Sequence, residues 1–334
     1  MPQFMGGKPG PGAFFDSDFA SIDSLLAVAL LHGIQGKNEC RVAIVTMSRP
    51  NLAIAGFLDA VERFYRGPAG NFAQVPPIGM ITTGVAGETS PAFIIPFDKK
   101  KPDGSPVYKN QVQRVLETGD PSTLIRNYLE AQYDQNGFLI LAGPATNLAA
   151  ALDFQGLKEL IKTKVKYLVI AGSEARFKAD LPAAKRLLTE WPTPIVLCPV
   201  EVGNSIDFPG ACIDKEFAAS APDNPVADAY RAFKAMPFDT PSGDMAAALY
   251  AGRPKEGYFP VSPTGTISIG PDGRTSFAPS DKGQHQQLTF DPAQKEKIAQ
   301  AYVELASAKP AAPRRFRPAV AEDPAAAAAA KPKQ

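Results

Sequence analysis

The sequence is poor in the residue types that build cysteine- or histidine-based sites. Its three cysteines, Cys40, Cys198 and Cys212, are widely spaced and form no Cys-x-x-Cys pair, so neither a disulfide framework nor a zinc site is expected. The two histidines, His32 and His285, leave few candidates for a Ser-His-Asp triad. We interpret His32, which follows an apolar stretch, as a helix C-terminal cap residue, and Cys198 as a small buried apolar residue.

The sequence also has almost no excess of positive or negative charge, and it has no long apolar run. The net charge is +1 with no basic stripe, so we expect no nucleic-acid partner. No apolar run is longer than the one at residues 25–31, which is too short to span a bilayer, so we expect no membrane partner. Residues 1–12 contain no apolar leader segment. We therefore expect a cytoplasmic protein, or a secreted or periplasmic one if a leader is missing from this chain.

Short apolar segments alternate with segments of helical pattern through the first 200 residues. Strands are expected at 13–15, 42–45, 78–82, 138–141, 167–170 and 194–197, and helices at 25–31, 52–65, 112–133, 147–152 and 181–190. Several of the strand segments are apolar throughout, which is typical of strands covered on both faces. The pattern predicts an α/β fold with an open, mostly parallel Rossmann-like sheet and helices on both faces.

The pattern changes after residue 200. Helices are expected at 226–236, 243–250 and 294–306, and a small β excursion at 258–269 and 275–277 around a Gly-Pro-Asp-Gly turn at 270–273. Residues 309–334 are rich in Pro and Ala and have no pattern that could pack. We therefore expect a flexible N-terminus at 1–12, one domain at 13–308 and a disordered tail at 309–334.

Carboxylates gather where the first strand ends. Asp16 and Asp18 follow Phe14-Phe15, and the period-2 alternation of a strand places them on the same side. Asp23 follows near a helix N-terminus, which favours negative charge. Such close carboxylates need a cation, a proton or a sugar hydroxyl, and Ca²⁺ takes oxygen ligands of this kind. These acids are also typical turn and N-cap residues, and an Asp-x-Asp alone also opens phosphatase-like folds.

Further sequence blocks give this motif a context. The blocks are Phe-Phe-Asp-Ser-Asp at 14–18 with Ile-Asp-Ser-Leu-Leu-Ala at 22–27, Val-Thr-Met-Ser-Arg-Pro-Asn at 45–51, Leu-Ala-Gly-Pro-Ala-Thr-Asn-Leu-Ala at 141–149, Val-Lys-Tyr-Leu-Val-Ile-Ala-Gly at 165–172 and Pro-Ser-Gly-Asp-Met-Ala at 241–246. In this order they resemble the nucleoside hydrolase family of the inosine-uridine-preferring type. The segments 190–196 and 224–230 resemble a divergent bacterial branch of it. The resemblance covers roughly residues 13–308.

The resemblance implies hydrolysis of the N-glycosidic bond of a ribonucleoside, or a related N-riboside, to ribose and free base. It implies a Ca²⁺ ion that holds a water molecule, with Asp18 as the general base for that water. The implied metal ligands are the side chains of Asp16, Asp18, Asp23, Ser24 and Asp244 and the peptide oxygen of Ala142. The implied substrate-binding residues are Asp23, Asn51, Arg176, Phe177 and Lys178. For Asn51, a helix N-cap is the alternative.

The sequence departs from the family pattern at three places. The family's aspartate pair is broken: with an insertion before Ile22, Asp23 takes the ribose-binding place and Ser24 the metal-binding place, and without it Ile22 and Asp23 take them. Either way a carboxylate is missing, which weakens a Ca²⁺ site. Arg176 and Lys178 replace a carboxylate and an amide. They could repel Ca²⁺, neutralise the acids, bind an acidic substrate or face solvent.

The third departure is the absence of a histidine before Asp244, where Gly243 stands, so no evident general acid protonates the leaving base. Two functions follow from the resemblance. One is an active N-ribosyl hydrolase, and the other is a metal-poor member of the fold that binds a ribosyl ligand without catalysis. A phosphatase with Asp16 as nucleophile is a weaker third reading. The expected partner is a small nucleoside or N-riboside, and the chain could form a homo-oligomer.

Overall fold

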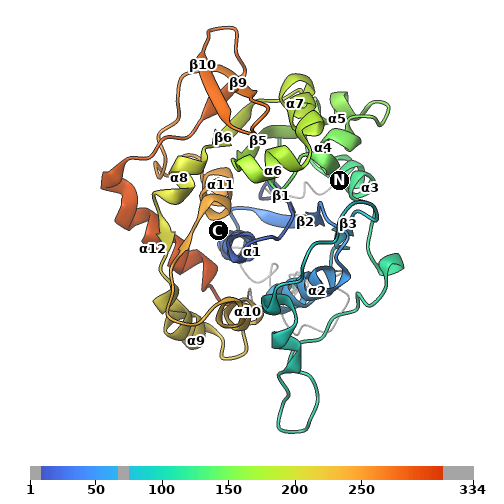
Figure 1. The fold of residues 1–334 in the computed structure, drawn as a ribbon, viewed down its shortest axis with the longest axis vertical. Helices are drawn as coiled ribbons and strands as arrows, with labels where there is room; N and C mark the ends of the chain where they lie inside the picture. Colours follow the sequence, from blue (N-terminus) through green and yellow to red (C-terminus); the bar gives the residue numbers. More distant parts are fainter. Residues whose placement is uncertain (1–8, 67–74, 311–334) are drawn as a thin grey trace, which may run out of the picture.

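The structure is a computed structural model that describes residues 9–66 and 75–310. The flexible N-terminus expected at 1–12 and the tail expected at 309–334 lie largely outside the described residues. Figure 1 shows a central sheet surrounded by helices. In the described part of the chain, no helix is long and apolar enough to cross a membrane.

The described residues form one nine-stranded sheet with the strand order β10-β9-β11-β6-β5-β4-β1-β2-β3. Its strands are β1 (Gly12–Ser17), β2 (Arg41–Met47), β3 (Gly79–Met80), β4 (Gly137–Ala142), β5 (Val165–Ala171), β6 (Ile195–Cys198), β9 (Gly265–Ile269), β10 (Thr275–Pro279) and β11 (His285–Gln287). All neighbours pair in parallel except those of β9. A separate antiparallel pair joins β7 (Asp207–Phe208) and β8 (Thr240–Pro241). The predicted open, mostly parallel sheet is confirmed.

Twelve α-helices occur among the described residues. They are α1 (Ile22–Gly36), α2 (Leu52–Arg66), α3 (Pro121–Glu130), α4 (Thr146–Ala151), α5 (Leu157–Lys164), α6 (Glu174–Ala179), α7 (Leu181–Glu190), α8 (Val200–Asn204), α9 (Glu216–Ser220), α10 (Pro225–Phe233), α11 (Gly243–Gly252) and α12 (Lys295–Ala306). Short 3₁₀ turns are η1 (Pro91–Phe93), η2 (Ile95–Asp98), η3 (Val115–Glu117), η4 (Gly210–Asp214) and η5 (Pro292–Gln294).

Helices cover both faces of the sheet, and this explains why the strands are apolar throughout. Along β1, Ala13 and Phe15 belong to the core that includes α1, α11 and α12. Phe14 between them belongs to the second core, with α3, α5 and α7. Successive side chains of a strand point to opposite faces, so a strand between two helical layers must be apolar at every position. The central strand β1 therefore delivers its polar residues only at its end.

Two predicted elements were wrong in extent. The helix expected at 112–133 is reduced to η3 and α3, because Pro121 occupies the first helical position of α3 and Asp120 caps it, accepting a bond of 2.8 Å from the N–H of Thr123. The strand expected at 258–269 begins only at Gly265. The turn at 270–273 is confirmed: Gly270 N–H donates to Arg274 O at 2.8 Å, and Gly273 adopts a φ of +81°.

His32 is not the helix cap residue that the sequence suggested. Helix α1 continues to Gly36, so His32 lies inside it. Its Nε2 lies 2.9 Å from Oε1 of Glu62 on α2, and both side chains are buried. Cys198 is buried, as predicted. Helices α5 and α6, which the apolar pattern did not reveal, follow β4 and β5 in the chain, and α6 becomes important at the strand ends.

Candidate functional site

Four polar side chains from distant segments meet at the carboxyl ends of the parallel strands. Asp18 follows β1, Ser24 lies in the first turn of α1, Arg176 lies on α6 and Asp244 lies in the first turn of α11. We call these four residues the strand-end cluster (helices α1, α6 and α11 in Figure 1). Open α/β sheets bind ligands at this edge.

The loops that carry the cluster pack closely, and one glycine shows how closely. A Cβ atom on Gly143, directly after β4, would lie 2.7 Å from the backbone nitrogen of Asp18 and 2.7 Å from Oγ of Ser48. Such a contact is too short for any side chain. Gly143 therefore lets the loop after β4 lie directly against the segment after β1, which fixes where Asp18 projects.

Arg176 is the centre of the strand-end cluster. Its Nη1 donates to Oδ1 of Asp244 at 2.6 Å and its Nη2 to Oδ2 at 2.9 Å, a bidentate pair. Oδ1 of Asp18 lies 3.3 Å from Nε and 3.2 Å from Nη2. Burial alone would lower the pKa of Arg176, but the charges of Asp244 and Asp18 outweigh burial and raise it. The guanidinium is therefore a fixed positive charge between two carboxylates.

Local sequence explains how Arg176 reaches this position. Ser173 caps α6, and its hydroxyl accepts from the N–H of Arg176 at 3.5 Å. The cap starts the helix directly after β5 and its Gly172 turn. Arg176 thus lies in the first turn of α6, at the same edge of the sheet as Asp18. Its side chain is 12% exposed and that of Asp18 is 13% exposed, so both groups remain within reach of a small solute.

Serine hydroxyls connect the cluster to the strand ends. Ser24 Oγ accepts from Arg176 Nη2 at 3.3 Å and donates to Oδ2 of Asp244 at 2.6 Å. Ser17 Oγ lies 3.0 Å from Ser24 Oγ and 2.9 Å from the carbonyl oxygen of Ala142. Ser24 therefore stands in the cluster, while Ile22 is buried in the apolar core.

Asp23 has a different environment from its neighbour Ser24. Its carboxylate accepts from the backbone N–H groups of Asp244 at 2.6 Å and Met245 at 3.2 Å, the first turn of α11. It thereby satisfies donors that a helix N-terminus leaves free. Burial, followed by the charge of Asp244, raises the pKa of Asp23 well above its usual range. In this structure Asp23 joins two helices.

Asp16 lies outside the strand-end cluster, two residues before Asp18. Its Oδ1 accepts from the hydroxyl of Thr46 and, at 2.6 Å, from Nδ2 of Asn147. Its Oδ2 is buried and has no partner in the described part of the chain. Burial raises the pKa of Asp16 to about 7, against the lowering effect of these two hydrogen bonds. Asp16 is held by neutral donors, whereas Asp18 is held by a cation.

The other three predicted substrate-binding residues lie outside the strand-end cluster. Asn51 is the N-cap of α2: its Oδ1 accepts from the N–H of Ile54 at 3.2 Å, while its Nδ2 donates to Thr89 Oγ1 at 2.7 Å. Phe177 is buried in the second core. Lys178 is exposed on α6 and is not brought into the cluster.

Three polar residues that support the acids were not among the predicted site residues. Ser17 connects Ser24 to Ala142, and Thr46 and Asn147 bind Asp16. Asn147 belongs to the Gly-Pro-Ala-Thr-Asn block at 143–147, so its presence in a family block was the available signal. Thr46 pairs with Asp16 in the parallel register of β1 and β2. That register could not be derived from the sequence.

The cluster does not fit the Ca²⁺ ion that the family resemblance implies. Ca²⁺ is bound by about six to eight oxygen atoms. Here both oxygens of Asp244, Oδ1 of Asp18 and the Ser24 hydroxyl already contact one guanidinium. The carbonyl of Ala142 faces the Ser17 hydroxyl. Within residues 9–66 and 75–310, no group of three or more His, Cys, Asp or Glu side chains could hold a metal ion.

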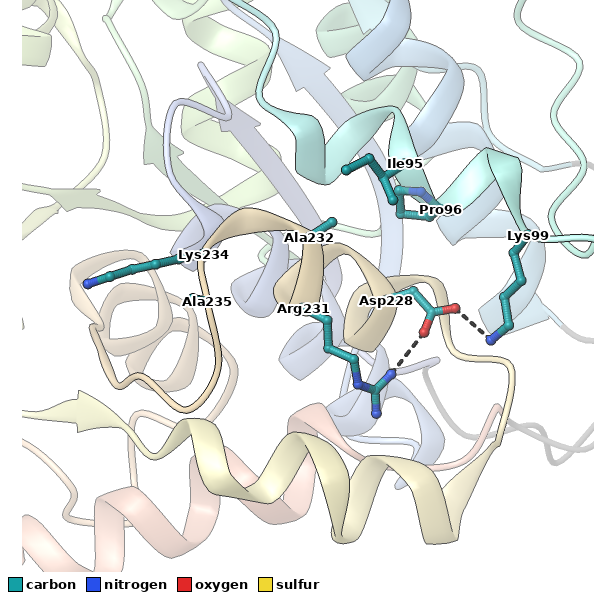
Figure 2. A pocket seen from close by; sticks show the side chains of 8 residues that line it. All are labelled: Ile95, Pro96, Lys99, Asp228, Arg231, Ala232, Lys234 and Ala235. Atoms are coloured by element: carbon teal, nitrogen blue, oxygen red, sulfur yellow. Dashed lines mark hydrogen bonds and ion pairs between the residues drawn. The ribbon is translucent and has the colours of Figure 1, made fainter.

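Cavities also lie outside the cluster. One of about 270 Å³ adjoins α6 and is lined by Ser173, Phe177 and Arg274, among others. A larger groove of about 480 Å³ runs between η2 and α10 (Figure 2). Figure 2 shows Asp228 between Lys99 and Arg231. One carboxylate oxygen of Asp228 lies 2.8 Å from Nζ of Lys99, and the other lies 2.8 Å from Nη1 of Arg231. The charge of Asp228 is matched by the groove's own side chains, so it offers no free acid.

Comparisons with known proteins agree with the fold. No protein-family model matches the sequence, and no curated protein matches it significantly. Solved structures do match. A plant nucleoside hydrolase, PpNRh1, is 17% identical with a TM-score of 0.64 over 90% of this chain and 100% of its own. The inosine-uridine-preferring nucleoside hydrolase from Bacillus anthracis is 15% identical with a TM-score of 0.62 over 89% and 99%.

A third match is the type III effector protein XopQ, whose structure was solved in complex with adenosine diphosphate ribose. It is 11% identical with a TM-score of 0.57 over 90% of this chain and 94% of its own. These structural similarities show that the chain has the nucleoside hydrolase fold. At such identities the fold is all that they show, and function must be argued from the site itself.

Proposed function

We propose that this chain binds the ribosyl group of an N-riboside at the strand-end cluster and hydrolyses its N-glycosidic bond. The observation that carries the proposal is Asp18, a partly exposed carboxylate held at the ligand-binding edge of a nucleoside hydrolase fold. A carboxylate at this position can accept hydrogen bonds from sugar hydroxyls and can take a proton from water.

In the proposed reaction a water molecule attacks C1′ of the riboside. Its proton passes to Asp18, the C1′–N bond breaks, and its electron pair stays on the nitrogen of the leaving base. The two histidines of the chain do not supply the proton for that nitrogen: His32 contacts Glu62, and Nδ1 of His285 accepts from the N–H of Ile267 at 2.9 Å. The leaving base then takes its proton from solvent.

Binding of a ribosyl ligand without turnover is the second candidate. The contacts between Arg176 and Asp18 support it, because Oδ1 of Asp18 already contacts the guanidinium and is not free to accept a proton from water. That XopQ, a protein of similar fold, was crystallised with adenosine diphosphate ribose makes this compound a sensible probe.

One experiment separates the two candidates. The purified chain is titrated calorimetrically with inosine, uridine, adenosine, ribose and adenosine diphosphate ribose, and release of the base is followed by chromatography. Binding with base release supports the hydrolase, and binding alone supports the second candidate. If no compound binds at millimolar concentration, the ribosyl site itself is wrong.

Asp18→Asn tests the proposed base. The variant should keep the fold and lose at least about 100-fold in turnover, the usual contribution of a general base. Asp281→Asn, which removes the same charge at an exposed position, is the control and should behave as the parent chain. Full turnover by Asp18→Asn would show that another group takes the proton.

A further inference from the structure

The strand-end cluster contains its own cation. Asp18, Asp244 and Ser24 come from three segments of the chain, and all three direct oxygen atoms at the guanidinium of Arg176. The contact distances range from 2.6 to 3.3 Å. Arg176 therefore occupies the point where the cluster's negative charges converge, which is where a bound metal ion would have to lie.

The hydrogen bonds around Ser24 show that the site is arranged for a donor group. Ser24 Oγ accepts from Arg176 Nη2 and donates to Asp244 Oδ2. Asp244 uses both of its oxygens on the planar fork of the guanidinium, a geometry that suits arginine and that a spherical ion does not need. The Ala142 carbonyl, a further oxygen near this point, lies 2.9 Å from Ser17 Oγ.

The positive charge of Arg176, like its contacts, argues against a metal ion at this point. A guanidinium cannot lose its proton under ordinary conditions, so Arg176 carries a fixed positive charge. A second cation in the same place would be repelled by Arg176. Placing a neutral serine at position 24, instead of another carboxylate, is consistent with a site already balanced by a positive side chain.

We infer that Arg176 is the permanent cation of this site and replaces a divalent metal ion, so that the site works without metal. Arg176 is then a positioning residue: it holds Asp18 and Asp244 in place, and the cluster binds or hydrolyses its ligand with no metal-held water. The inference deepens the proposed function and rests on it only for the identity of that ligand.

The test is a calorimetric titration of the full chain with CaCl₂ after treatment with a chelator. The parent chain should show no binding at millimolar Ca²⁺. The double variant Ser24→Asp with Arg176→Ala restores an acid and removes the cation, so it should bind Ca²⁺ at least about 100-fold more tightly than the parent. Ser24→Asp alone, which keeps the guanidinium, should bind far more weakly than the double variant.

Lys178→Ala is the matched control, because it removes an exposed positive charge from the same short helix. It should leave Ca²⁺ binding unchanged. Circular dichroism checks that each variant is folded. If the double variant does not fold, the parent chain and Ser24→Asp decide the question by themselves: tight, stoichiometric Ca²⁺ binding by the parent chain overturns the inference, and its absence in both supports it.

The titration uses no riboside, so its outcome is separate from that of the proposed function. A chain that binds neither Ca²⁺ nor any riboside would refute the proposed function and leave the inference intact. A chain that turns over a riboside and holds one Ca²⁺ tightly would support the proposed function and refute the inference. Turnover that is unchanged by a chelator would support both.

Discussion

Two regions of this molecule bury carboxylates beside positive or titratable side chains, and they do so differently. In the helical layer, Glu62 on α2 contacts His32 on α1 at 2.9 Å and Arg66 at 3.6 Å, and the ring of Tyr65 stacks on His32 at 4.4 Å. Every member comes from two neighbouring helices, and the side chains of His32 and Glu62 are almost fully buried.

The strand-end cluster also pairs carboxylates with a positive side chain, but its residues come from distant segments of the chain. Its residues come from α1, α6, α11 and the segment after β1. Asp18 and Arg176 are 158 positions apart in the sequence. Its side chains keep some exposure at the edge of the sheet where ligands bind. A buried ion pair alone therefore does not indicate a functional site. Position at the strand ends and access to a solute distinguish the cluster from the structural pair.

The largest effect is expected from Arg176→Ala. This variant leaves Asp18 and Asp244 close together without their cation. Breaking a buried charge pair from one side costs about 3–5 kcal/mol, so the free energy of unfolding in denaturant should fall by that amount. A loss below about 1 kcal/mol would mean that solvent already neutralises the cluster, and the cluster would then resemble a surface pair.

Asp16→Asn should change stability in a pH-dependent way. The pKa of Asp16 is raised from 3.8 to about 7 in the folded chain. The folded state therefore keeps a proton that the unfolded state loses, and stability falls as pH rises from about 4 to about 7. Asparagine keeps an acceptor for Thr46 and Asn147 without the charge, so the variant should gain up to about 4 kcal/mol at pH 8.

The check on Asp16→Asn is a pair of denaturation curves, one at pH 4 and one at pH 8. The variant and the parent chain should differ little at pH 4, where Asp16 is protonated in the folded parent. An equal difference at both pH values would show that hydrogen bonding, and not the charge, sets the stability of this position.

Glu62→Gln tests the helical layer and should show the opposite pH trend. Burial opposes the charge of Glu62, but His32 and Arg66 outweigh burial and lower its pKa below 4.5. The stability that Glu62 supplies is therefore present above pH 4.5 and lost as pH falls through its folded pKa. The variant should be about 1–3 kcal/mol less stable at pH 7, and the gap should narrow in thermal melts at lower pH.

Lys178→Ala should have the smallest effect. The side chain is exposed, and such substitutions usually change stability by less than about 0.5 kcal/mol. Turnover and riboside affinity should also stay unchanged. A clear loss of riboside affinity would show that Lys178 contacts the ligand, as the family resemblance suggested. Lys178, and not Arg176, would then be the positive side chain that acts on the ligand.

Local pattern was enough to predict much of the fold. Strands β1, β2, β4, β5 and β6 and helices α1, α2 and α7 are apolar runs or amphipathic segments, whose burial follows from their own sequence. The helix expected at 112–133 was wrong because Pro121 and its Asp120 cap start a shorter helix. Short helices such as α6 carry too few apolar residues to show a period.

The acids of the candidate site were visible in the sequence, but their partners were not. That Asp16, Asp18 and Asp23 gather around the end of the first strand follows from the chain itself, because they are neighbours in sequence. That each acquires a different partner was decided by packing. Asp16 meets Thr46 through strand register, Asp23 meets the start of α11, and Asp18 meets Arg176.

The sequence by itself determined an α/β chain with a sheet buried on both faces and acids at the end of its first strand, because periodicity and local order are properties of neighbouring residues. Only the tertiary structure decided which positive charge lies between Asp18 and Asp244. Arg176 and Lys178 have the same charge and are two residues apart, yet α6 turns one into the cluster and leaves the other in solvent. The reason is that a helix of this length takes its orientation from the strand and cap that precede it, and these place Arg176 at the strand ends.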